Sequence, residues 1–346
     1  MLENGLDVCA IFFDYQKAFD SVPHRPLLTK LSRLGLDVNI LRWIRNYLTC
    51  RHQKVVVNGS SSECTPVLSG VPQGSILGPL LFLIYVNDLA SLTVSERSQL
   101  VLYADDLVLY KPISTSHDYC AVQNDMATIE AWSLRNSLTF NAAKCKYMVI
   151  SRRKIPTAPP SPLLLNGTPV ERVECFRYLG LLLASDLSWS QHIDSICSKA
   201  KKILGLLYRR YYNYADSDVL KQLYISLVRP HLEYGCVIWD PYTTKGKKSM
   251  EKVQHFACKL ATKRWDASYE ELLGLLELPT LEERRVHMKL CLLYKIIHEL
   301  CYFPSGVFCN RHSSYNVRSH SLSLHQPFAR TNAYYFSFVG HLEEVY

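Results

Sequence analysis

The stretch from Gln99 to Lys111 constrains the fold most strongly, because it sets two adjacent carboxylates between two apolar runs. The runs on either side of Tyr103-Ala104-Asp105-Asp106 are rich in Leu, Val and Tyr and have the length of buried strands. Two carboxylates inside a buried strand would need partners or would lose their charge. The sequence therefore predicts a β-hairpin whose turn carries both Asp105 and Asp106.

This turn lacks the residue that a tight hairpin normally requires. Two-residue turns favour Asn-Gly or Asp-Gly because their backbone needs a positive φ, and there is no glycine between Tyr103 and Asp106. Asp is also an ordinary turn residue, so a plain acidic turn is one interpretation. The other is a divalent cation that compensates the two like charges, since such cations prefer carboxylate oxygens. The stretch alone leaves both interpretations open.

A third carboxylate follows the first predicted strand. Residues 8–13 read Val-Cys-Ala-Ile-Phe-Phe, a continuous apolar run that is typical of a buried strand, and Asp14 comes directly after it. Active sites of sheet proteins often lie at the C-terminal ends of strands. Asp14 is therefore a candidate site residue, with capping of the following turn as the alternative.

A glycine-rich loop precedes an apolar helix predicted over residues 76–89. The loop reads Ser69-Gly70-Val71-Pro72-Gln73-Gly74-Ser75. Its glycines let the backbone approach a ligand closely, and the amides of a helix N-terminus follow. The side-chain amide of Gln73 either contacts a base or sugar or satisfies the loop's own backbone.

The hydrophobic period changes along the chain, from mixed strands and helices to helices alone beyond His192. This predicts an α+β fold with a boundary near residues 185–190 and an irregular tail from 301 to 346. The predicted helices cover residues 21–34, 39–48, 119–137, 218–228, 250–263 and 281–300, besides the one that begins near His192.

Composition adds limits on partners and location. The chain has 346 residues and 48% hydrophobic composition, enough for about two domains. Residues 190–265 hold fourteen Lys and Arg against six Asp and Glu, which accounts for the whole net charge of +8. This suits a polyanion partner, although a solvated basic surface fits equally well.

The longest apolar run is too short for a membrane span, and residues 1–7 do not resemble a signal peptide. We expect an intracellular protein, nuclear or cytoplasmic, with no membrane partner.

Together these motifs resemble the reverse transcriptase of non-long-terminal-repeat, LINE-type retrotransposons, the jockey-like group in particular. Residues 13–20, Phe-Asp-Tyr-Gln-Lys-Ala-Phe-Asp, look like the family's first palm motif, residues 69–79 like its second and residues 103–106 like its third. Segments of further likeness, which extend the resemblance to about residue 300, are residues 141–146, 176–180 and 227–235.

The resemblance implies both a fold and an activity. The fold would be a right-hand polymerase palm, an antiparallel sheet with helices, over residues 1–185 including the primer-grip region. A helical, thumb-like or connection-like domain would follow over residues 186–300. The activity would be RNA-directed DNA polymerase, a nucleotidyltransferase that extends a DNA primer on an RNA template with dNTPs. The implied cofactor is a pair of Mg²⁺ ions, for which Mn²⁺ is a substitute.

Roles for individual residues follow from the same resemblance. Asp14, Asp105 and Asp106 would be the catalytic carboxylates that bind the metal ions. Lys144 lies in the fourth motif, where a lysine would donate a proton to pyrophosphate. The alternative for Lys144 is an exposed lysine in a turn.

Three more residues would meet the nucleotide. Phe19 falls where the family places an aromatic gate beneath the sugar, which excludes a 2′-hydroxyl and so selects deoxynucleotides. Otherwise it is an ordinary core residue. Gln73 and Gly74 would line the template and the incoming nucleotide.

The sequence also departs from the family pattern, because the first motif begins only a few residues after Met1. We therefore expect the fingers and the N-terminal endonuclease of relatives to be absent, as in a truncated element copy. This leaves an alternative function, a catalytically silent chain that only binds nucleic acid through its basic second half. A metal-dependent phosphohydrolase built on the same carboxylates is a third interpretation, in which the glycine-rich loop would have no role.

Overall fold

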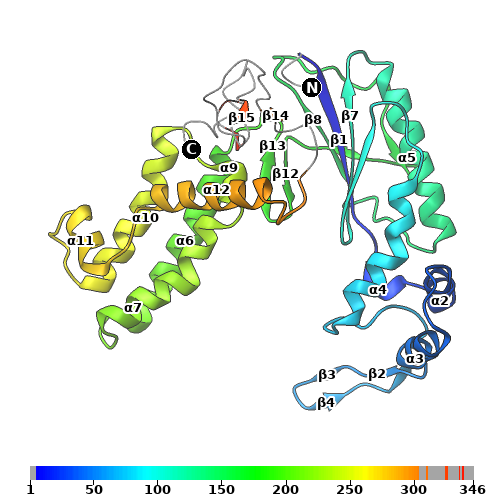
Figure 1. Ribbon diagram of the computed structural model, residues 1–346, viewed down its shortest axis with the longest axis horizontal. Coiled ribbons are helices and arrows are strands. Elements are labelled where there is room, and N and C mark those ends of the chain that lie inside the picture. The colour runs from blue at the N-terminus through cyan, green and yellow to red at the C-terminus, as the bar shows by residue number, and fades with distance from the viewer. Residues whose placement is uncertain (1–4, 304–308, 311–323, 326–334, 336, 339–346) are drawn as a thin grey trace. The chain divides into compact units, whose positions relative to one another are not determined.

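The computed structural model describes residues 5–303, 309–310, 324–325, 335 and 337–338. It divides into two compact units between Cys175 and Phe176, each with its own hydrophobic core. We call residues 5–175 the sheet unit and the described residues from 176 onward the helical unit (Figure 1). A sheet with helices followed by a helical region confirms the predicted α+β fold class. The predicted tail lies almost entirely outside the described residues.

The sheet unit is built on a five-stranded sheet in the order β11-β8-β1-β7-β6. Its strands are β1 (Asp7–Phe13), β6 (Gln99–Tyr103), β7 (Asp106–Ile113), β8 (Lys146–Ile150) and β11 (Glu171–Arg172). Strand β1 lies at the centre and pairs antiparallel with β7 and β8. It is buried along its whole length: residues 8–13 are apolar, as predicted, and the buried carboxylate of Asp7 accepts hydrogen bonds from Ser151 and Thr157.

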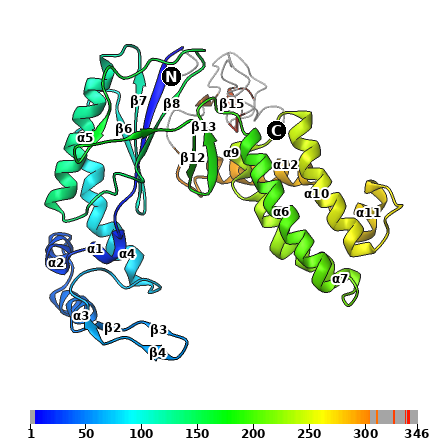
Figure 2. The ribbon, with the colours of Figure 1, turned by 180° about the vertical axis from the view of Figure 1, so that it is seen from behind.

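Helices α4 (Leu77–Val86) and α5 (Asp118–Arg135) pack on the sheet (Figures 1 and 2). Phe82 of α4 and Met126 of α5 are fully buried in one core with Ile11 of β1. Helices α4 and α5 thus fix the central strand, and with it the position of the residue that follows the strand.

The helix predicted over residues 21–34 is two helices, α1 (Ala18–Ser21) and α2 (His24–Arg33). Val22 between them is extended, with ψ of 115°. The ring of Pro23 disfavours helical backbone at the preceding residue, which explains the break.

The remaining elements of the sheet unit are shorter or peripheral. They are α3 (Val38–Leu48), β2 (His52–Gln53), β3 (Val56–Val57), β4 (Ser60–Ser61), β5 (Thr65–Pro66), the 3-10 helix η2 (Asn87–Ser91), β9 (Leu164–Leu165) and β10 (Thr168–Pro169). Strand β2 pairs with β5 and β3 with β4, so residues 52–66 form an exposed ribbon.

Except for its first residue, a hairpin of β12 (Cys175–Tyr178) and β13 (Leu181–Ala184) lies at the start of the helical unit. Leu181 is buried in the core of this unit and packs against Gly235, so the hairpin belongs here and the division falls before the predicted boundary at 185/186. The helices are α6 (Ser190–Tyr211), α7 (Ser217–Leu223), the π-helical turn η3 (Tyr224–Val228), α8 (Arg229–Glu233), α9 (Cys236–Trp239), α10 (Thr244–Thr262), α11 (Tyr269–Leu276) and α12 (Leu281–Ile297). Within the described ranges, no helix is long and apolar enough to cross a membrane.

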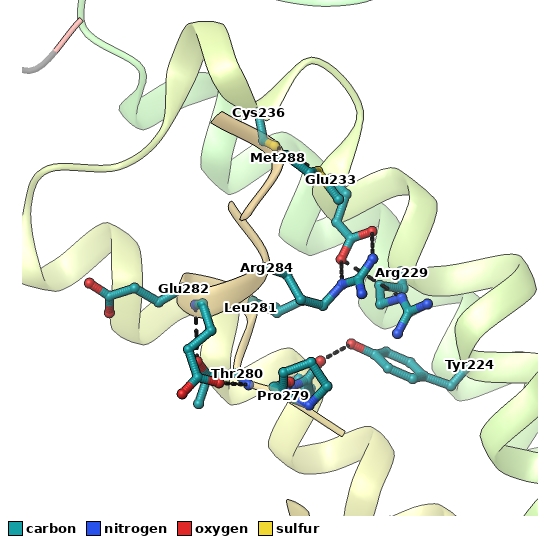
Figure 3. A network of polar contacts seen from close by, with 12 residues as sticks. Tyr224, Arg229, Glu233, Cys236, Pro279, Thr280, Leu281, Glu282, Arg284 and Met288 are labelled. Carbon is teal, nitrogen blue, oxygen red and sulfur yellow. Dashed lines mark hydrogen bonds and ion pairs between the residues drawn. The ribbon is translucent and has the colours of Figure 1, made fainter. Parts of the chain in front are cut away.

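A polar network fixes α12 against its neighbours (Figure 3). Arg284 of α12 pairs with Glu233 of α8, which also lies 3.7 Å from Arg229. At the start of α12, the backbone amide of Glu282 donates to Glu251 of α10 at 3.0 Å. These contacts hold α12 in place. The same helix carries two buried cations, Arg285 and Lys289.

Candidate active site

The three predicted carboxylates come together where β1 ends and β7 begins. Asp106 is the first residue of β7 and pairs with Tyr103 across the hairpin. The register between β1 and β7 runs to Phe13↔Leu107, and its extension by one residue sets Asp14 opposite Asp106. Asp105 precedes Asp106 in the turn. The fold thus joins two motifs that lie far apart in the sequence.

The pKa of Asp106 reports this crowding of negative charge. Partial burial raises the pKa, and the carboxylates of Asp105 and Asp14 raise it further. Cα atoms of directly opposed residues in antiparallel strands are about 5 Å apart, close enough for such charges to interact. The site therefore has a surplus of negative charge that a cation would compensate.

The hairpin differs from the prediction at its turn. Both acids were expected in the turn, but only Ala104 and Asp105 lie between the strands. Ala104 supplies the positive φ that the missing glycine would have given, with φ of 53°. This left-handed conformation costs an L-residue about 1–2 kcal/mol and persists because the strand pairing on both sides holds it. Asp105 therefore lies in a turn whose conformation is fixed by the strands β6 and β7 on either side.

Asp14 is held by the segment that carries the fourth motif. Its backbone carbonyl accepts from the amide of Asn141 at 2.7 Å, and its own amide donates to Sγ of Cys145 at 3.3 Å. Its Oδ1 atom is buried and accepts no hydrogen bond from the described residues, while Nζ of Lys144 lies 3.8 Å away. A buried carboxylate oxygen that accepts no hydrogen bond is uncommon, and a bound cation would account for it.

The glycine-rich loop lies against the segment that follows Asp14. The side-chain amide of Gln73 donates to the Asp20 carboxylate at 2.8 Å, and the hydroxyl of Ser69 donates to the Asp20 carbonyl at 2.9 Å. Gln73 thus binds a carboxylate rather than the loop's own backbone. Sequence reasoning did not single out Asp20 as a site residue, although it is the last residue of the first motif.

Phe19 and Gly74 have different surroundings. The ring of Phe19 is half-buried and packs on Phe82, with centroids 4.6 Å apart. The backbone carbonyl of Phe19 accepts from the amide of Val71 at 2.8 Å, which ties it to the loop. Gly74 has φ of 76°, and no atom lies within 4 Å of the position that a Cβ would take. The backbone at Gly74 is therefore open to a close approach.

Tyr15 is a residue of the site that sequence reasoning missed. Its hydroxyl is buried and forms no hydrogen bond within the described part of the chain, and its ring stacks on Phe140 with centroids 4.5 Å apart. Burial, with Cys145 and Asp105 nearby, raises the pKa of this hydroxyl. Its position directly after Asp14 could have indicated that Tyr15 belongs to the site. The sequence alone, however, does not distinguish such a tyrosine from an ordinary core aromatic residue.

The carboxylates suit a divalent cation without forming a complete cage for one. Among the described residues, no three His, Cys, Asp or Glu side chains gather closely enough to hold a metal ion by themselves. Mg²⁺ usually binds through one or two carboxylates and completes its shell with water and substrate phosphates. The Oδ1 atom of Asp14, which accepts no hydrogen bond, and the raised pKa of Asp106 both fit this kind of site.

Comparison with known proteins assigns the chain to a family. The family model described as reverse transcriptase (RNA-dependent DNA polymerase) matches residues 1–183, more than half of the chain. The chain belongs to the reverse transcriptase family. Membership implies the use of a divalent metal and the binding of a nucleic-acid template and primer.

Relatives of this reverse transcriptase confirm the predicted resemblance to the jockey-like group. The RNA-directed DNA polymerase from mobile element jockey of Drosophila melanogaster is 30% identical over 268 residues, which are 75% of this chain and 28% of that protein. The probable RNA-directed DNA polymerase from transposon X-element of the same organism is 27% identical over 258 residues, 73% of this chain and 28% of that protein. The chain thus spans less than a third of the length of these relatives. A solved structure of telomerase from Candida tropicalis in complex with the TWJ fragment of telomeric RNA aligns with a TM-score of 0.43 and 12% identity, over 87% of this chain and 48% of that chain.

Two glycines of the reverse transcriptase loop form a matched pair for substitution. Gly70 has φ of 93°, and a Cβ there would lie 2.7 Å from the Cα of Asp20, whereas Gly74 is left-handed in open space. We expect Gly70→Ala to lower the free energy of unfolding by about 2–4 kcal/mol, because strain and overpacking add. Gly74→Ala should cost about 1–2 kcal/mol from strain alone. Urea unfolding of both variants measures the difference, and equal losses would contradict the close packing of Gly70 on Asp20.

The raised pKa of Asp106 makes the stability of the metal-free protein depend on pH. Between the ordinary Asp pKa of 3.8 and the raised folded value, the folded chain binds more protons than the unfolded chain, so this group lowers stability as pH rises. We expect Asp106→Asn to melt roughly 1–3 °C above the wild type near pH 7 in EDTA. The difference should shrink as the pH falls toward 3.8, where both states protonate the carboxyl. Added Mg²⁺ should stabilise the wild type more than the variant. A variant less stable than wild type in EDTA near pH 7 would argue against charge repulsion at Asp106.

Proposed function

We propose that this chain is the polymerising part of an RNA-directed DNA polymerase that extends a DNA primer on an RNA template with dNTPs. The observation that carries the proposal is the convergence of Asp14, Asp105 and Asp106 from two sequence motifs, where strand β1 ends and its neighbour β7 begins. Membership of the reverse transcriptase family supports the same reaction.

Asp14, Asp105 and Asp106 would hold two Mg²⁺ ions. Mg²⁺ bound there would lower the pKa of the primer 3′-hydroxyl and neutralise negative charge on the triphosphate. The carboxylates contribute the charge that attracts the ions, and the ends of β1 and β7 keep them in place. Burial, together with repulsion from Asp105 and Asp14, raises the pKa of Asp106, and a bound cation would relieve the repulsive part.

Lys144 would act as the proton donor to the pyrophosphate leaving group. Its Nζ lies 3.8 Å from Oδ1 of Asp14, and the side chain is two-thirds exposed, so it can move from the carboxylate to a phosphate oxygen. The ion pair keeps the ammonium close to the reacting atoms before substrate binds. This supports the catalytic role over that of an unrelated surface lysine.

Phe19, Gln73 and Gly74 would form the nucleotide-facing wall. The contacts of Phe19 with Phe82 and with the loop backbone give its ring the rigidity that a barrier beneath the sugar requires. The open backbone at Gly74 allows a nucleotide or template strand to approach. The side-chain amide of Gln73 donates one hydrogen bond to Asp20, and its other N–H and its carbonyl oxygen would hydrogen-bond to the template.

Primer extension on poly(rA)/oligo(dT) with Mg²⁺ and dTTP tests the proposal. Extension that requires both primer and template supports polymerase activity. A folded chain that binds the duplex without extending it would instead be a nucleic-acid binder, the function that the basic stretch at residues 190–265 alone would support. Release of inorganic phosphate without primer would point to a phosphohydrolase.

A further inference from the structure

Four aromatic rings form a connected, partly exposed surface on the helical unit. We call Tyr208, Tyr212, Phe256 and Trp265 the aromatic surface. Ring centroids are 4.8 Å apart between Tyr208 and Tyr212, 6.4 Å between Tyr212 and Trp265, and 5.9 Å between Trp265 and Phe256. Tyr208, Trp265 and Phe256 are 42%, 43% and 38% exposed, respectively. Tyr212 packs against the helical core, while the other three rings keep part of their surface exposed.

Hydrogen bonds hold the aromatic surface in one conformation. Nε1 of Trp265 donates to the hydroxyl of Tyr212 at 2.9 Å. Nζ of Lys263 donates to the carbonyl of Ala215 at 3.2 Å and lies 5.6 Å from the centre of the Tyr212 ring. Because the rings are fixed before anything binds, a ligand that stacks on them loses little of its binding energy to ordering the protein.

Positive charge lies along the same face of α6. Lys201, Gly205, Tyr208 and Tyr212 follow one another at steps of four, three and four residues, which places them in one line along the helix. The guanidinium of Arg209 lies over Gly205, with Nη1 3.8 Å from where a Cβ would be. It therefore borders the aromatic surface.

Acidic residues lie at the borders of the two segments that carry the rings, at Asp194, Asp216, Glu251 and Asp266. Residues 195–215 and 252–265, which carry all four rings, contain no Asp or Glu. Within the described ranges, Lys201, Arg209 and Lys263 form no ion pair with a carboxylate. A protein partner would need only an apolar or acidic face, whereas exposed aromatic rings bordered by cations without ion pairs match unpaired bases on a phosphate backbone.

We propose that the aromatic surface, with Lys201, Arg209 and Lys263, is a stacking platform for unpaired bases of the RNA template. The inference rests on the proposed function, in which the template is the long strand that must be unpaired before it is copied. A duplex hides the faces of its bases, so the platform distinguishes single strands from double strands without reading sequence.

Fluorescence anisotropy with a labelled, unstructured 20-nucleotide oligo(rA), without Mg²⁺ or dNTPs, tests this proposal. We expect Tyr208→Ala and Trp265→Ala each to weaken binding on the order of tenfold, and Tyr208→Phe to bind like the wild type because its ring still stacks. Tyr294→Ala, an exposed tyrosine of α12 outside the surface, should have no effect. Unchanged binding in both ring variants would overturn the platform.

Arg209 and Arg210 provide a second pair that does not depend on the folding of the ring variants. Both are exposed, but successive residues of a helix point about 100° apart, so Arg210 faces away from the line of Lys201 and Tyr208. Arg209→Ala should weaken oligo(rA) binding and lower its salt dependence by about 0.7 in the logarithmic slope, whereas Arg210→Ala should not. Equal effects, or equal binding of duplex RNA, would show nonspecific charge attraction instead. Since the assay contains no reaction step, a chain that fails to extend primers still gives a clear result here.

Discussion

Asp105→Ala and Asp14→Ala are each expected to reduce Mg²⁺-dependent primer extension at least about a thousandfold. A metal ion supplies several kcal/mol of stabilisation to a phosphoryl-transfer transition state, and about 4 kcal/mol corresponds to a factor of a thousand in rate. Asp14 and Asp105 come from different motifs, so the loss of either would remove a proposed metal ligand that the other motif does not replace. Initial rates on poly(rA)/oligo(dT), measured across Mg²⁺ concentrations, give the effect.

Asp88→Asn is the control for this loss. Asp88 is an exposed carboxylate of the sheet unit that pairs with Lys30 at 2.9 Å, and it has no place in the proposed site. It should extend primers at nearly the wild-type rate. Circular dichroism and melting temperature establish that the active-site variants are folded. Folded Asp14→Ala or Asp105→Ala protein that retains more than about a tenth of the activity would rule out these carboxylates as essential metal ligands.

Asp240→Ala is expected to give the largest loss of stability, about 3–5 kcal/mol in the free energy of unfolding of the helical unit. Asp240 follows α9 and pairs with two cations of α12, Arg285 through Nε at 2.6 Å and Lys289 through Nζ. The side chains of Arg285 and Lys289 are 1% and 5% exposed. Removal of the carboxylate would leave both charges buried without their counter-ion, which costs far more than the pair itself contributes.

A surface pair in the same unit calibrates this effect. Glu282 binds Lys247 at 2.7 Å, with side chains 50% and 38% exposed, and Glu282→Ala should cost no more than about 1 kcal/mol. Urea unfolding followed by circular dichroism gives both values on the same scale. Similar costs for Asp240→Ala and Glu282→Ala would mean that water reaches Arg285 and Lys289 and that the buried pair is not a structural requirement.

The central strand, the acidic hairpin and the principal helices could be predicted because each is a local signal. The apolar run before Asp14 and the Leu, Val and Tyr runs around residues 103–106 have strand length and composition, and β1, β6 and β7 form there. Residues 119–137 have helical periodicity, and α5 covers nearly the same range. The motifs at residues 13–20, 69–79 and 103–106 were recognisable for the same reason, because each is a short segment that can be read from the sequence alone.

Short or interrupted elements were harder to predict. Helix α11 spans eight residues, too few for a clear hydrophobic period, although Ser268 and Glu271 form a capping box at its start. The break between α1 and α2 depends on Pro23, and the turn at Ala104 on a left-handed residue that is not glycine. In these places the surrounding structure, rather than local preference, selects the conformation.

The sequence by itself determined which carboxylates exist and which strands carry them, because alternation and apolar runs act over a few residues. Only the tertiary structure decided that Asp14 faces Asp106, that Asp20 holds Gln73, and that Tyr15 is buried beside Asp105. The same holds for the aromatic surface, whose rings come from α6, the residue after α6, α10 and the segment after α10. Strand register and helix packing determine which of these residues come into contact. Both depend on interactions between residues that are far apart in the sequence, which no local sequence pattern reveals.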